Sequence, residues 1–209
     1  MIWFIDIDGC LCDNHSEYIR RSCLWLDNNM IEHSKPNIDV YDFGKAFSVD
    51  GKLGDVCFES EEFAGYYIIP PNGDAVEFLK HRSESGDVVA ILTSRIPDLR
   101  IPITTEVRDF LGKLLPGRKT VSLQVLTKIW LDTFKVPYDN IIHRADKAEF
   151  MKDFPTGVAV EDSPYTLAGY ACEGVRCIAM SASYNLGLNV PYVKSWKDMY
   201  SLSEEDFTR

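Results

Sequence analysis

The chain has 209 residues and is 45% hydrophobic, so it can bury a sizeable core as one domain or as one domain with an insertion. Its formal net charge of −10 argues against a protein that grips long nucleic acid through the phosphates. The charge does not exclude a small anionic substrate, because a metal ion and a few local cations can reverse the field of one pocket.

The sequence favours a cytoplasmic protein without a membrane span. No apolar run approaches the ~20 residues that a membrane-spanning helix needs. The first residues lack the basic region and the long apolar stretch of a signal peptide. The six cysteines are too sparse for a disulfide scaffold, and no second Cys/His pair with the spacing of a metal site accompanies Cys10-x-Cys12. We therefore expect reduced, partly buried thiols.

The chain opens on a predicted strand that ends on two acids. Residues Ile2 to Ile5 are β-branched and aromatic, which is typical of a buried parallel strand. Asp6 and Asp8 would share a face if the strand continued through both, and Gly9 then allows a turn. Ligands bind at the C-terminal ends of strands in an open α/β sheet. Because two neighbouring carboxylates repel each other, we expect a divalent cation or a shared proton there.

Residues 14–70 are predicted to form a small, mostly helical inserted subdomain. A helical pattern runs from Ser16 to Met30. Beyond it, glycines and a proline interrupt the chain, and aromatic residues are scattered between them, which is unusual for a disordered linker. A structureless loop of this length inside a compact domain is also uncommon.

The rest of the chain, residues 1–13 and 71–209, is predicted to form an α/β core with a doubly wound parallel sheet. Strands and helices alternate there, which implies such a sheet. Ser163 and Pro164 together are a strong signal for a helix start. The predicted strands are 87–92, 140–143, 157–160 and 176–180, and the predicted helices are 74–82, 105–115, 123–134, 145–153 and one that begins at 163.

Four polar elements fall at or just beyond predicted strand ends, where an open α/β sheet gathers them. They are Asp6 with Asp8, Thr93 with Ser94, Lys147, and Glu161 with Asp162. A hydroxyl and free backbone N–H groups after a strand can cradle a phosphate, and a lysine can neutralise its oxygens. Acids from two strands can hold Mg²⁺, which prefers oxygen ligands. Together these parts predict a phosphoryl-transfer site with a carboxylate nucleophile.

In this order and spacing, the chain resembles the haloacid dehalogenase (HAD) superfamily. Asp6-Ile-Asp8-Gly9 resembles its first motif, Thr93 its second, Lys147 its third and Glu161-Asp162 its fourth. The resemblance covers about residues 1–13 and 71–190 and implies a HAD-like Rossmannoid core, with residues 14–70 where that superfamily carries a type-1 cap. It also implies a Mg²⁺-dependent phosphatase or mutase.

The resemblance further implies the roles of individual residues. Asp6 attacks phosphorus and forms an aspartyl-phosphate, and Asp8 acts first as general acid and then as general base. Thr93 and the Ser94 N–H hold the phosphate, and Lys147 pairs with Asp6 and with the phosphate. The implied metal ligands are Asp6, Asp8 through its backbone carbonyl, Asp162, and Glu161 either through water or directly.

Shorter features look similar to the 5′(3′)-deoxyribonucleotidase-like branch of the superfamily. They are the cap-sized insertion, Lys147-Ala-Glu, and Ser183-Tyr184-Asn185. This likeness implies a small phosphorylated substrate, a nucleoside monophosphate, with aromatic cap residues over the nucleoside. The substrate-binding candidates are Trp25 and Phe43 from the insertion and Arg95 beside the second motif.

Several alternatives stay open at this point. Thr93 alternatively caps a following helix, Lys152 is a rival for Lys147, and Trp25 and Phe43 alternatively belong to the interior of the cap. The four histidines show no ligand-like spacing and are assigned no role. The alternative functions are a HAD phosphatase or mutase acting on another small phosphate or on a nucleic-acid 3′-phosphate end, and a non-catalytic binding protein on this fold.

Overall fold

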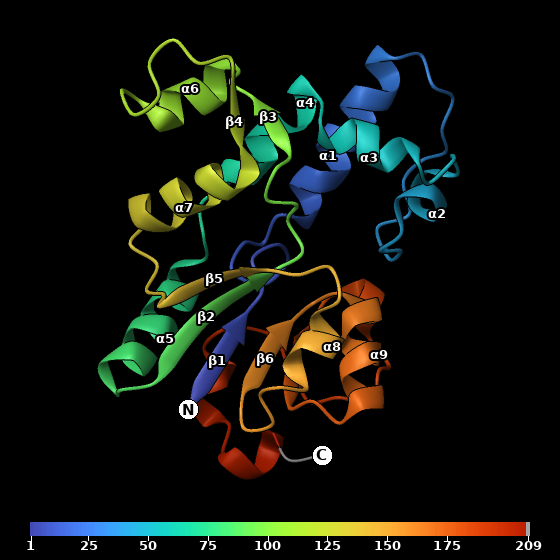
Figure 1. Ribbon diagram of the computed structural model, residues 1–209. Helices are drawn as coiled ribbons and strands as arrows, with labels where there is room; N and C mark the ends of the chain where they lie inside the picture. The colour runs from blue at the N-terminus through green and yellow to red at the C-terminus, as the bar shows by residue number, and fades with distance from the viewer. Residues whose placement is uncertain (208–209) are drawn as a thin grey trace. The chain divides into compact units, whose positions relative to one another are not determined.

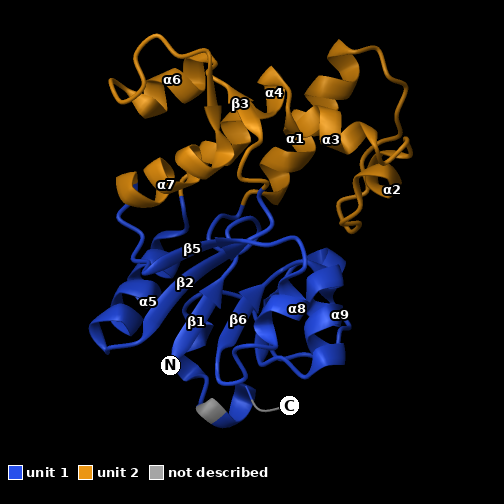
Figure 2. Ribbon diagram, viewed as in Figure 1, with its two compact units in different colours: residues 1–13, 71–95, 134–209 blue, residues 14–70, 96–133 orange. Residues whose placement is uncertain are grey.

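The computed structural model describes residues 1–207, which form two compact units (Figures 1 and 2). Unit 1 comprises residues 1–13, 71–95 and the described chain from 134 onward, and unit 2 comprises residues 14–70 and 96–133. The predicted insertion therefore lies wholly within unit 2. Residues 96–133, which the sequence analysis placed in the core, group with the insertion.

A six-stranded sheet forms the centre of unit 1. The strands are β1 (Ile2–Ile5), β2 (Val88–Thr93), β5 (Asn140–His143), β6 (Val158–Glu161), β7 (Cys177–Met180) and β8 (Tyr192–Val193). Their order is β5-β2-β1-β6-β7-β8, and every neighbouring pair is parallel. The three central strands are almost continuously buried, as a parallel sheet covered on both faces requires. The predicted doubly wound parallel sheet is confirmed, and the short strand β8 is an addition to it.

Helices cover both faces of this sheet, because successive residues of a strand point to opposite sides. Trp3 packs edge-on against Phe78 of one covering helix, with 5.3 Å between the ring centroids. Phe4 points to the other side, into a buried cluster that includes Tyr170. The helices of unit 1 are α5 (Gly73–Glu84), α8 (Lys147–Met151) and α9 (Pro164–Glu173), followed by the 3-10 helices η2 (Ser183–Asn185), η3 (Asp198–Ser201) and η4 (Glu204–Phe207).

The structure confirms the predicted start of α9 and the residue that caps it. Ser163 is the N-cap, its hydroxyl accepts a hydrogen bond from Thr166 N at 3.4 Å, and Pro164 opens the helix. Pro is favoured at this position because its missing N–H has no partner within the helix. The cap places the residues just before it, Glu161 and Asp162, at a sharp strand-to-helix turn.

Unit 2 is mostly helical, as predicted for residues 14–70, and also contains a small antiparallel sheet that was not predicted. Its elements are α1 (His15–Asn28), α2 (Phe43–Phe47), α3 (Leu53–Phe58), α4 (Glu61–Ala64), η1 (Gly65–Ile68), β3 (Arg100–Pro102), α6 (Thr105–Leu111), β4 (Thr120–Ser122) and α7 (Leu123–Thr133). Strands β3 and β4 pair antiparallel. Helix α6 ends at Leu111 instead of Leu115, because Gly112 takes a positive φ of 56° that leaves the helical region.

A buried arginine and a tryptophan explain why residues 96–133 join unit 2. Arg21 of α1 donates to both carboxylate oxygens of Glu106 on α6, at 2.9 and 3.0 Å. Trp130 of α7 donates its indole N–H to the backbone oxygen of Ile69 at 2.8 Å. These hydrogen bonds join segments that are far apart in sequence, so no local sequence pattern predicts them.

An aromatic cluster fills the interior of unit 2. The ring of Tyr18 lies between 6.2 and 6.5 Å from four phenylalanine rings, those of Phe43, Phe47, Phe58 and Phe63. This cluster accounts for the aromatic content that argued against a disordered linker. None of the helices within residues 1–207 combines the length and the apolar run that a bilayer crossing requires.

Candidate active site

The polar residues predicted at strand ends meet at one edge of the unit 1 sheet. Strand β1 is hydrogen-bonded between β2 and β6, and all three run in the same direction. Asp6 follows β1 directly, and Thr93 and Glu161 are the last residues of β2 and β6. Because parallel strands end at the same edge, these side chains are brought together although they are far apart in sequence.

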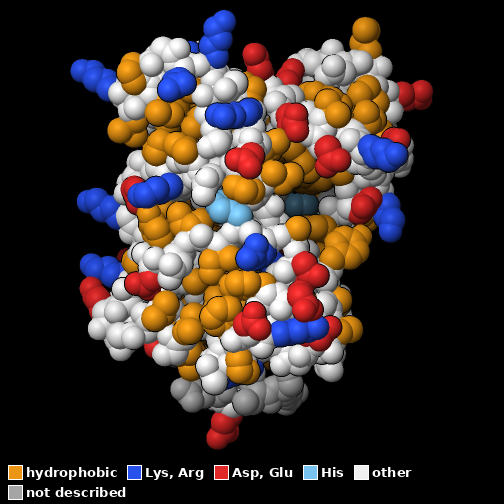
Figure 3. Space-filling model, in the orientation of Figure 1, with side chains coloured by type: hydrophobic (Ala, Val, Ile, Leu, Met, Phe, Trp, Pro, Cys, Tyr) orange, Lys and Arg blue, Asp and Glu red, His pale blue; other side chains and the backbone are white. Residues whose placement is uncertain are grey.

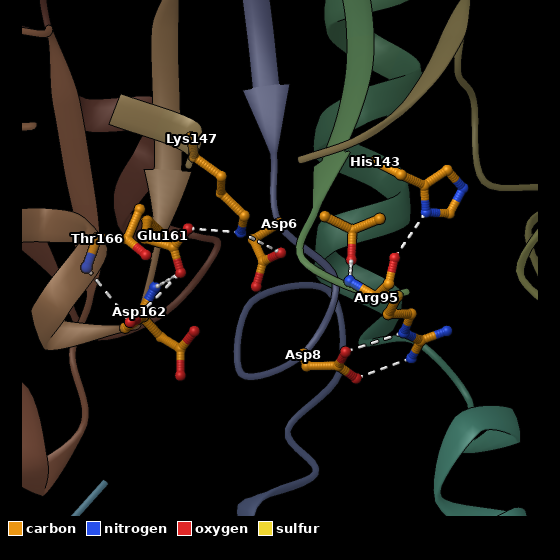
Figure 4. Close-up of polar contacts among 10 residues, drawn as sticks. Asp6, Asp8, Arg95, His143, Lys147, Glu161, Asp162 and Thr166 are labelled. Carbon is orange, nitrogen blue, oxygen red and sulfur yellow. Dashed lines mark hydrogen bonds and ion pairs between the residues drawn. The ribbon is translucent and has the colours of Figure 1, made fainter. Parts of the chain in front are cut away.

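A buried lysine joins two acids that stand at the ends of two of these strands (Figure 4). Lys147 Nζ lies 2.6 Å from Asp6 Oδ1 and 2.8 Å from Glu161 Oε2. It is the first residue of α8, and the Asp146 side chain caps that helix by accepting a backbone hydrogen bond. Burial opposes the ammonium charge, but the charges of the two carboxylates outweigh it and raise the pKa of Lys147 well above its usual value. The structure thus brings Lys147 into the site, whereas its rival Lys152 is exposed.

Glu161 orients this lysine. Its Oε2 accepts from Lys147, and its Oε1 accepts from the backbone N–H groups of Asp162 and Ser163 at 3.1 and 3.0 Å. The side chain is almost fully buried. Both oxygens are therefore engaged by protein groups, and a contact between Glu161 and a metal ion stays a prediction.

Asp6, Cys10 and Asp162 form a buried cluster that fits a divalent cation. One ligand atom from each lies within 4.8 Å of the ligand atoms of the other two. Burial raises the pKa of Asp6 to about 7, against the opposing charge of Lys147. Burial, followed by the charges of Glu161 and Asp6, raises the pKa of Asp162 well above its usual value. A cation between the two carboxylates would relieve their repulsion, so the donor set suits one.

The position of Asp162 is held from two sides. The Tyr184 hydroxyl donates to its Oδ2 at 2.5 Å, and the Asn185 side-chain amide donates to its backbone oxygen at 2.8 Å. On the other side lies Gly9, which has a positive φ of 79°. A Cβ at position 9 would overlap the Asp162 carboxylate, so only glycine suits both the turn and the close approach.

The second acid of the first motif takes a different partner. Strand β1 ends at Ile5 and the chain turns, so Asp8 does not continue it. The Asp8 oxygens accept from Arg95 Nη2 at 2.8 Å and Nε at 2.9 Å, a bidentate pair that Figure 4 shows. Arg95 is itself held in place, because its N–H donates to the Thr93 hydroxyl at 3.2 Å and its backbone oxygen lies 2.9 Å from His143 Nδ1.

The two residues of the second motif differ in exposure. Thr93 is almost fully buried, whereas Ser94 is exposed. The alternative that Thr93 caps a following helix is wrong, because the next helix is α6, which Thr104 caps. Both residues lie at the sheet edge where a phosphate was predicted.

The two aromatic residues that were predicted to contact the substrate belong to unit 2, whereas the strand-end residues belong to unit 1. Trp25 and Phe43 belong to unit 2, and each is only 6% exposed. Their burial agrees with the alternative interpretation, in which they form part of the interior of that unit. Contact with a substrate stays a prediction for both.

Sequence reasoning missed four residues at this edge of the sheet. Cys10 was set aside because no second Cys/His pair accompanies it, Tyr184 and Asn185 entered only as a point of resemblance, and His143 was assigned no role. His143 ends β5 and is in register with Thr93 of β2. His143 could therefore have been found as a polar residue at a predicted strand end. The contacts of Cys10, Tyr184 and Asn185 depend on turns that the sequence pattern does not predict.

The comparisons with known proteins bear on the fold. No protein-family model matches the sequence, and no curated protein does. A haloacid dehalogenase-like hydrolase from Streptococcus pneumoniae matches with a TM-score of 0.60 at 14% identity, covering 96% of each chain. A HAD-superfamily hydrolase of subfamily IA from Geobacter sulfurreducens matches with a TM-score of 0.57 at 12% identity, covering 97% of this chain and 98% of that one. CbbY from Rhodobacter sphaeroides, solved with xylulose-(1,5)-bisphosphate, matches with a TM-score of 0.53 at 14% identity, covering 93% of this chain and 94% of that one. The chain therefore has the fold of HAD-superfamily structures over nearly its whole length.

Proposed function

We propose that this chain is a Mg²⁺-dependent phosphomonoesterase that hydrolyses a nucleoside monophosphate through an aspartyl-phosphate. One observation carries the proposal: buried Asp6 lies at a strand end, 2.6 Å from buried Lys147 and beside Asp162. A carboxylate nucleophile, a fixed positive charge and a cation position are the parts that covalent phosphoryl transfer needs. The HAD-like fold supports the same function, as do the four motifs, three of which stand at strand ends and the fourth of which, Lys147, begins α8.

Mg²⁺ would be held by Asp6 and Asp162, with the backbone carbonyl of Asp8 that the motif resemblance implies. The carboxylates are oxygen donors, which Mg²⁺ prefers. When bound, the ion supplies positive charge that shields the nucleophilic carboxylate from the negative phosphate. Cys10 is the one donor of the cluster that does not suit Mg²⁺.

Asp6 is positioned for attack because Lys147 holds one of its carboxylate oxygens. A bond forms between a carboxylate oxygen and phosphorus while the ester P–O bond breaks, and the leaving oxygen takes a proton from Asp8. Water then attacks the aspartyl-phosphate and gives its proton to Asp8, which releases inorganic phosphate and restores Asp6. The Lys147 ammonium offsets the negative charge of the phosphoryl oxygens throughout.

Arg95 links substrate binding to the protonation of the Asp8 carboxyl group. A bidentate arginine contact is strongest to a carboxylate, so this contact weakens when Asp8 takes up the proton that the leaving oxygen needs. A substrate phosphate competes for the guanidinium group, so Arg95 is our candidate for a phosphate contact beside Thr93 and Ser94.

The choice of a nucleotide rests on the resemblance and on the charge of the chain. Ser183-Tyr184-Asn185 looks similar to the deoxyribonucleotidase-like branch. On the face of the described chain in Figure 3, lysine and arginine side chains are dispersed among acidic and apolar ones, which suits a small phosphate better than a long polyanion. The proposal includes the cytoplasmic location that the sequence favours, because six cysteines are too sparse for the disulfide scaffold of a secreted protein.

The test is phosphate release from a panel of substrates, measured with Mg²⁺ and with EDTA. The panel contains 5′- and 3′-deoxyribonucleotides, ribonucleotides, sugar phosphates and a 3′-phosphorylated oligonucleotide. Wild type is compared with Asp6→Asn and with Asp153→Asn, a matched change at an exposed aspartate of the same unit. We expect metal-dependent release from mononucleotides that Asp6→Asn abolishes and Asp153→Asn retains.

The other outcomes each revise a defined part of the proposal. Release only from sugar phosphates or the oligonucleotide would keep the mechanism and discard the nucleotide. Substantial activity of Asp6→Asn would refute the aspartyl-phosphate. No release from any substrate, with a nucleotide still bound, would favour the non-catalytic alternative.

The proposed role of Trp25 and Phe43 needs an assay that separates recognition from folding. Because both are buried, changing either to alanine should cost about 3–5 kcal/mol of unfolding free energy. Trp25→Phe and Phe43→Leu keep more of the buried volume and should leave folded protein. A shift in nucleotide preference without a change on a small artificial phosphate ester would support contact with the nucleoside. Equal losses on both substrates would assign the two side chains to the interior of unit 2.

A further inference from the structure

Cys10 places a sulfur atom beside the two carboxylates of the proposed cation site. Its ligand atom and those of Asp6 and Asp162 all lie within 4.8 Å of one another. The side chain of Cys10 is only 3% exposed, and the carboxylates beside it are also buried. A thiol is an unusual neighbour for a site built for Mg²⁺, because that ion prefers oxygen donors.

The backbone holds the thiol at this position. The N–H of Cys10 donates to Ile7 O at 3.3 Å, and its backbone oxygen accepts from Trp196 Nε1 at 3.0 Å. The preceding residue, Gly9, lies against the Asp162 carboxylate, which fills the space that a Cβ would need. The turn after β1 therefore fixes Cys10 and Asp162 relative to each other, and the thiol does not depend on a mobile loop.

The donor set matches a thiophilic cation in type. Zn²⁺ binds thiolate, carboxylate and imidazole groups, with bonds of about 2.3 Å to sulfur and about 2.0–2.2 Å to oxygen. In the tetrahedral geometry that Zn²⁺ adopts, these bond lengths put two donors about 3.4–3.6 Å apart. The three ligand atoms of this cluster lie within 4.8 Å of one another, so each pair has to approach by at most about 1.4 Å on binding.

We propose that Cys10 supplies a sulfur donor to the cation position between Asp6 and Asp162, so that this site binds thiophilic divalent cations such as Zn²⁺ and Cd²⁺ in competition with Mg²⁺. On binding, the S–H bond breaks, a sulfur–metal bond forms, and the proton passes to solvent. The inference rests on the cation position in the proposed function, but it does not need the chain to be a phosphatase.

Cd²⁺ is the probe, because a bond between thiolate and cadmium gives an ultraviolet charge-transfer band. The full-length chain is titrated with Cd²⁺ while this absorbance is recorded, and the titration is repeated with Mg²⁺ in excess. Wild type is compared with Cys10→Ser and with Cys12→Ser, a buried thiol two positions along that is not part of the cluster. Cys172→Ser removes the exposed thiol, which could bind Cd²⁺ at the surface.

We expect a saturable band at one Cd²⁺ per chain in wild type, Cys12→Ser and Cys172→Ser, and its loss in Cys10→Ser. Removal of this ligand should weaken Cd²⁺ binding at least as much as the ~10–100-fold typical of losing an outer-shell partner. Asp162→Asn should also weaken it, because the same ion contacts both residues. Mg²⁺ should raise the Cd²⁺ concentration needed for half-saturation.

Three results would overturn the inference: no band in wild type, a band that survives in folded Cys10→Ser, or a titration that excess Mg²⁺ does not shift. Circular dichroism checks folding, and Cys10→Ala replaces the serine variant if that one does not fold. Mg²⁺-dependent phosphate release without a cadmium band would refute only the sulfur ligand. A cadmium band without hydrolysis of any ester would refute only the proposed activity.

Discussion

Replacing Lys147 by methionine tests the charge balance on which the candidate site depends. The ammonium group lies 2.6 and 2.8 Å from two carboxylate oxygens, and at an effective dielectric constant of ~20 each contact contributes about 6 kcal/mol. Desolvation of the charges offsets most of this, and breaking a buried pair costs about 3–5 kcal/mol. We expect Lys147→Met to lose about that much unfolding free energy, a large part of the ~5–15 kcal/mol that stabilises a domain.

Lys152→Met is the matched control. Lys152 also contacts two carboxylates, those of Glu149 at 2.7 Å and Glu173 at 3.0 Å, but its side chain is 39% exposed. Exposed ion pairs contribute little because water already solvates both charges. Urea unfolding of both variants at neutral pH, followed by circular dichroism, should therefore show a large loss for Lys147→Met and a small one for Lys152→Met.

The pH dependence of the Lys147→Met deficit gives a second readout. Lys147 lowers the pKa of Asp6, which burial raises to about 7, so this pKa rises further in the variant. The native variant then holds protons that its unfolded chain releases above the ordinary aspartate pKa of about 3.9. Its stability should fall as the pH rises from there. The wild type shows the same fall up to its Asp6 pKa of about 7, so the deficit of the variant should grow only above pH 7, and added Mg²⁺ should restore part of it. Equal losses for the two lysine variants, or a deficit that does not grow above pH 7, would refute the reasoning.

Two further predictions concern the environment of Asp162. Gly9→Ala and Gly86→Ala both place alanine at a positive φ, 79° and 84°, which costs about 1–2 kcal/mol, but only position 9 is crowded. Urea unfolding should show a larger loss of stability for Gly9→Ala than for Gly86→Ala. Calorimetric titration should show that only Gly9→Ala loses Mg²⁺ binding. Normal Mg²⁺ binding by Gly9→Ala would contradict the close approach of Gly9 and Asp162. Tyr184→Phe removes a hydrogen bond to Asp162 and should weaken Mg²⁺ binding about 10–100-fold in the same titration. Tyr192→Phe, at a 61% exposed tyrosine, should bind as wild type does, and equal affinities for the two variants would assign the Tyr184 hydroxyl no role in orienting the carboxylate.

Most elements of the unit 1 fold could be predicted, because their signals are local. A continuous apolar run such as residues 88–92 is typical of a parallel strand covered on both faces, and it forms most of β2. Ser163 and Pro164 act on the first turn of their own helix, so the start of α9 needs no distant contact. The polar residues that follow the strands were found for the same reason, since the end of an apolar run is visible in the sequence itself.

The grouping of residues 96–133 was not predictable in this way. The contacts that attach them to unit 2, among them Arg21 with Glu106 and Trp130 with Ile69, are between residues 85 and 61 positions apart. Each is an interaction of one side chain with one distant group. Neither hydrophobic periodicity nor composition specifies such a pair, and the short strands β3 and β4 carry too few residues for a strand pattern.

The sequence by itself determined which residues stand at the ends of the central strands, because strand formation depends on neighbouring side chains. The tertiary structure decided which of them are partners. It paired Asp8 with Arg95 across 87 positions and Asp6 with Lys147 across 141, and it brought Cys10 against the carboxylates. These pairings depend on the register of parallel strands and on the turn after β1. A shift of one residue in either would send the side chains to other partners, so the arrangement exists only in the folded chain.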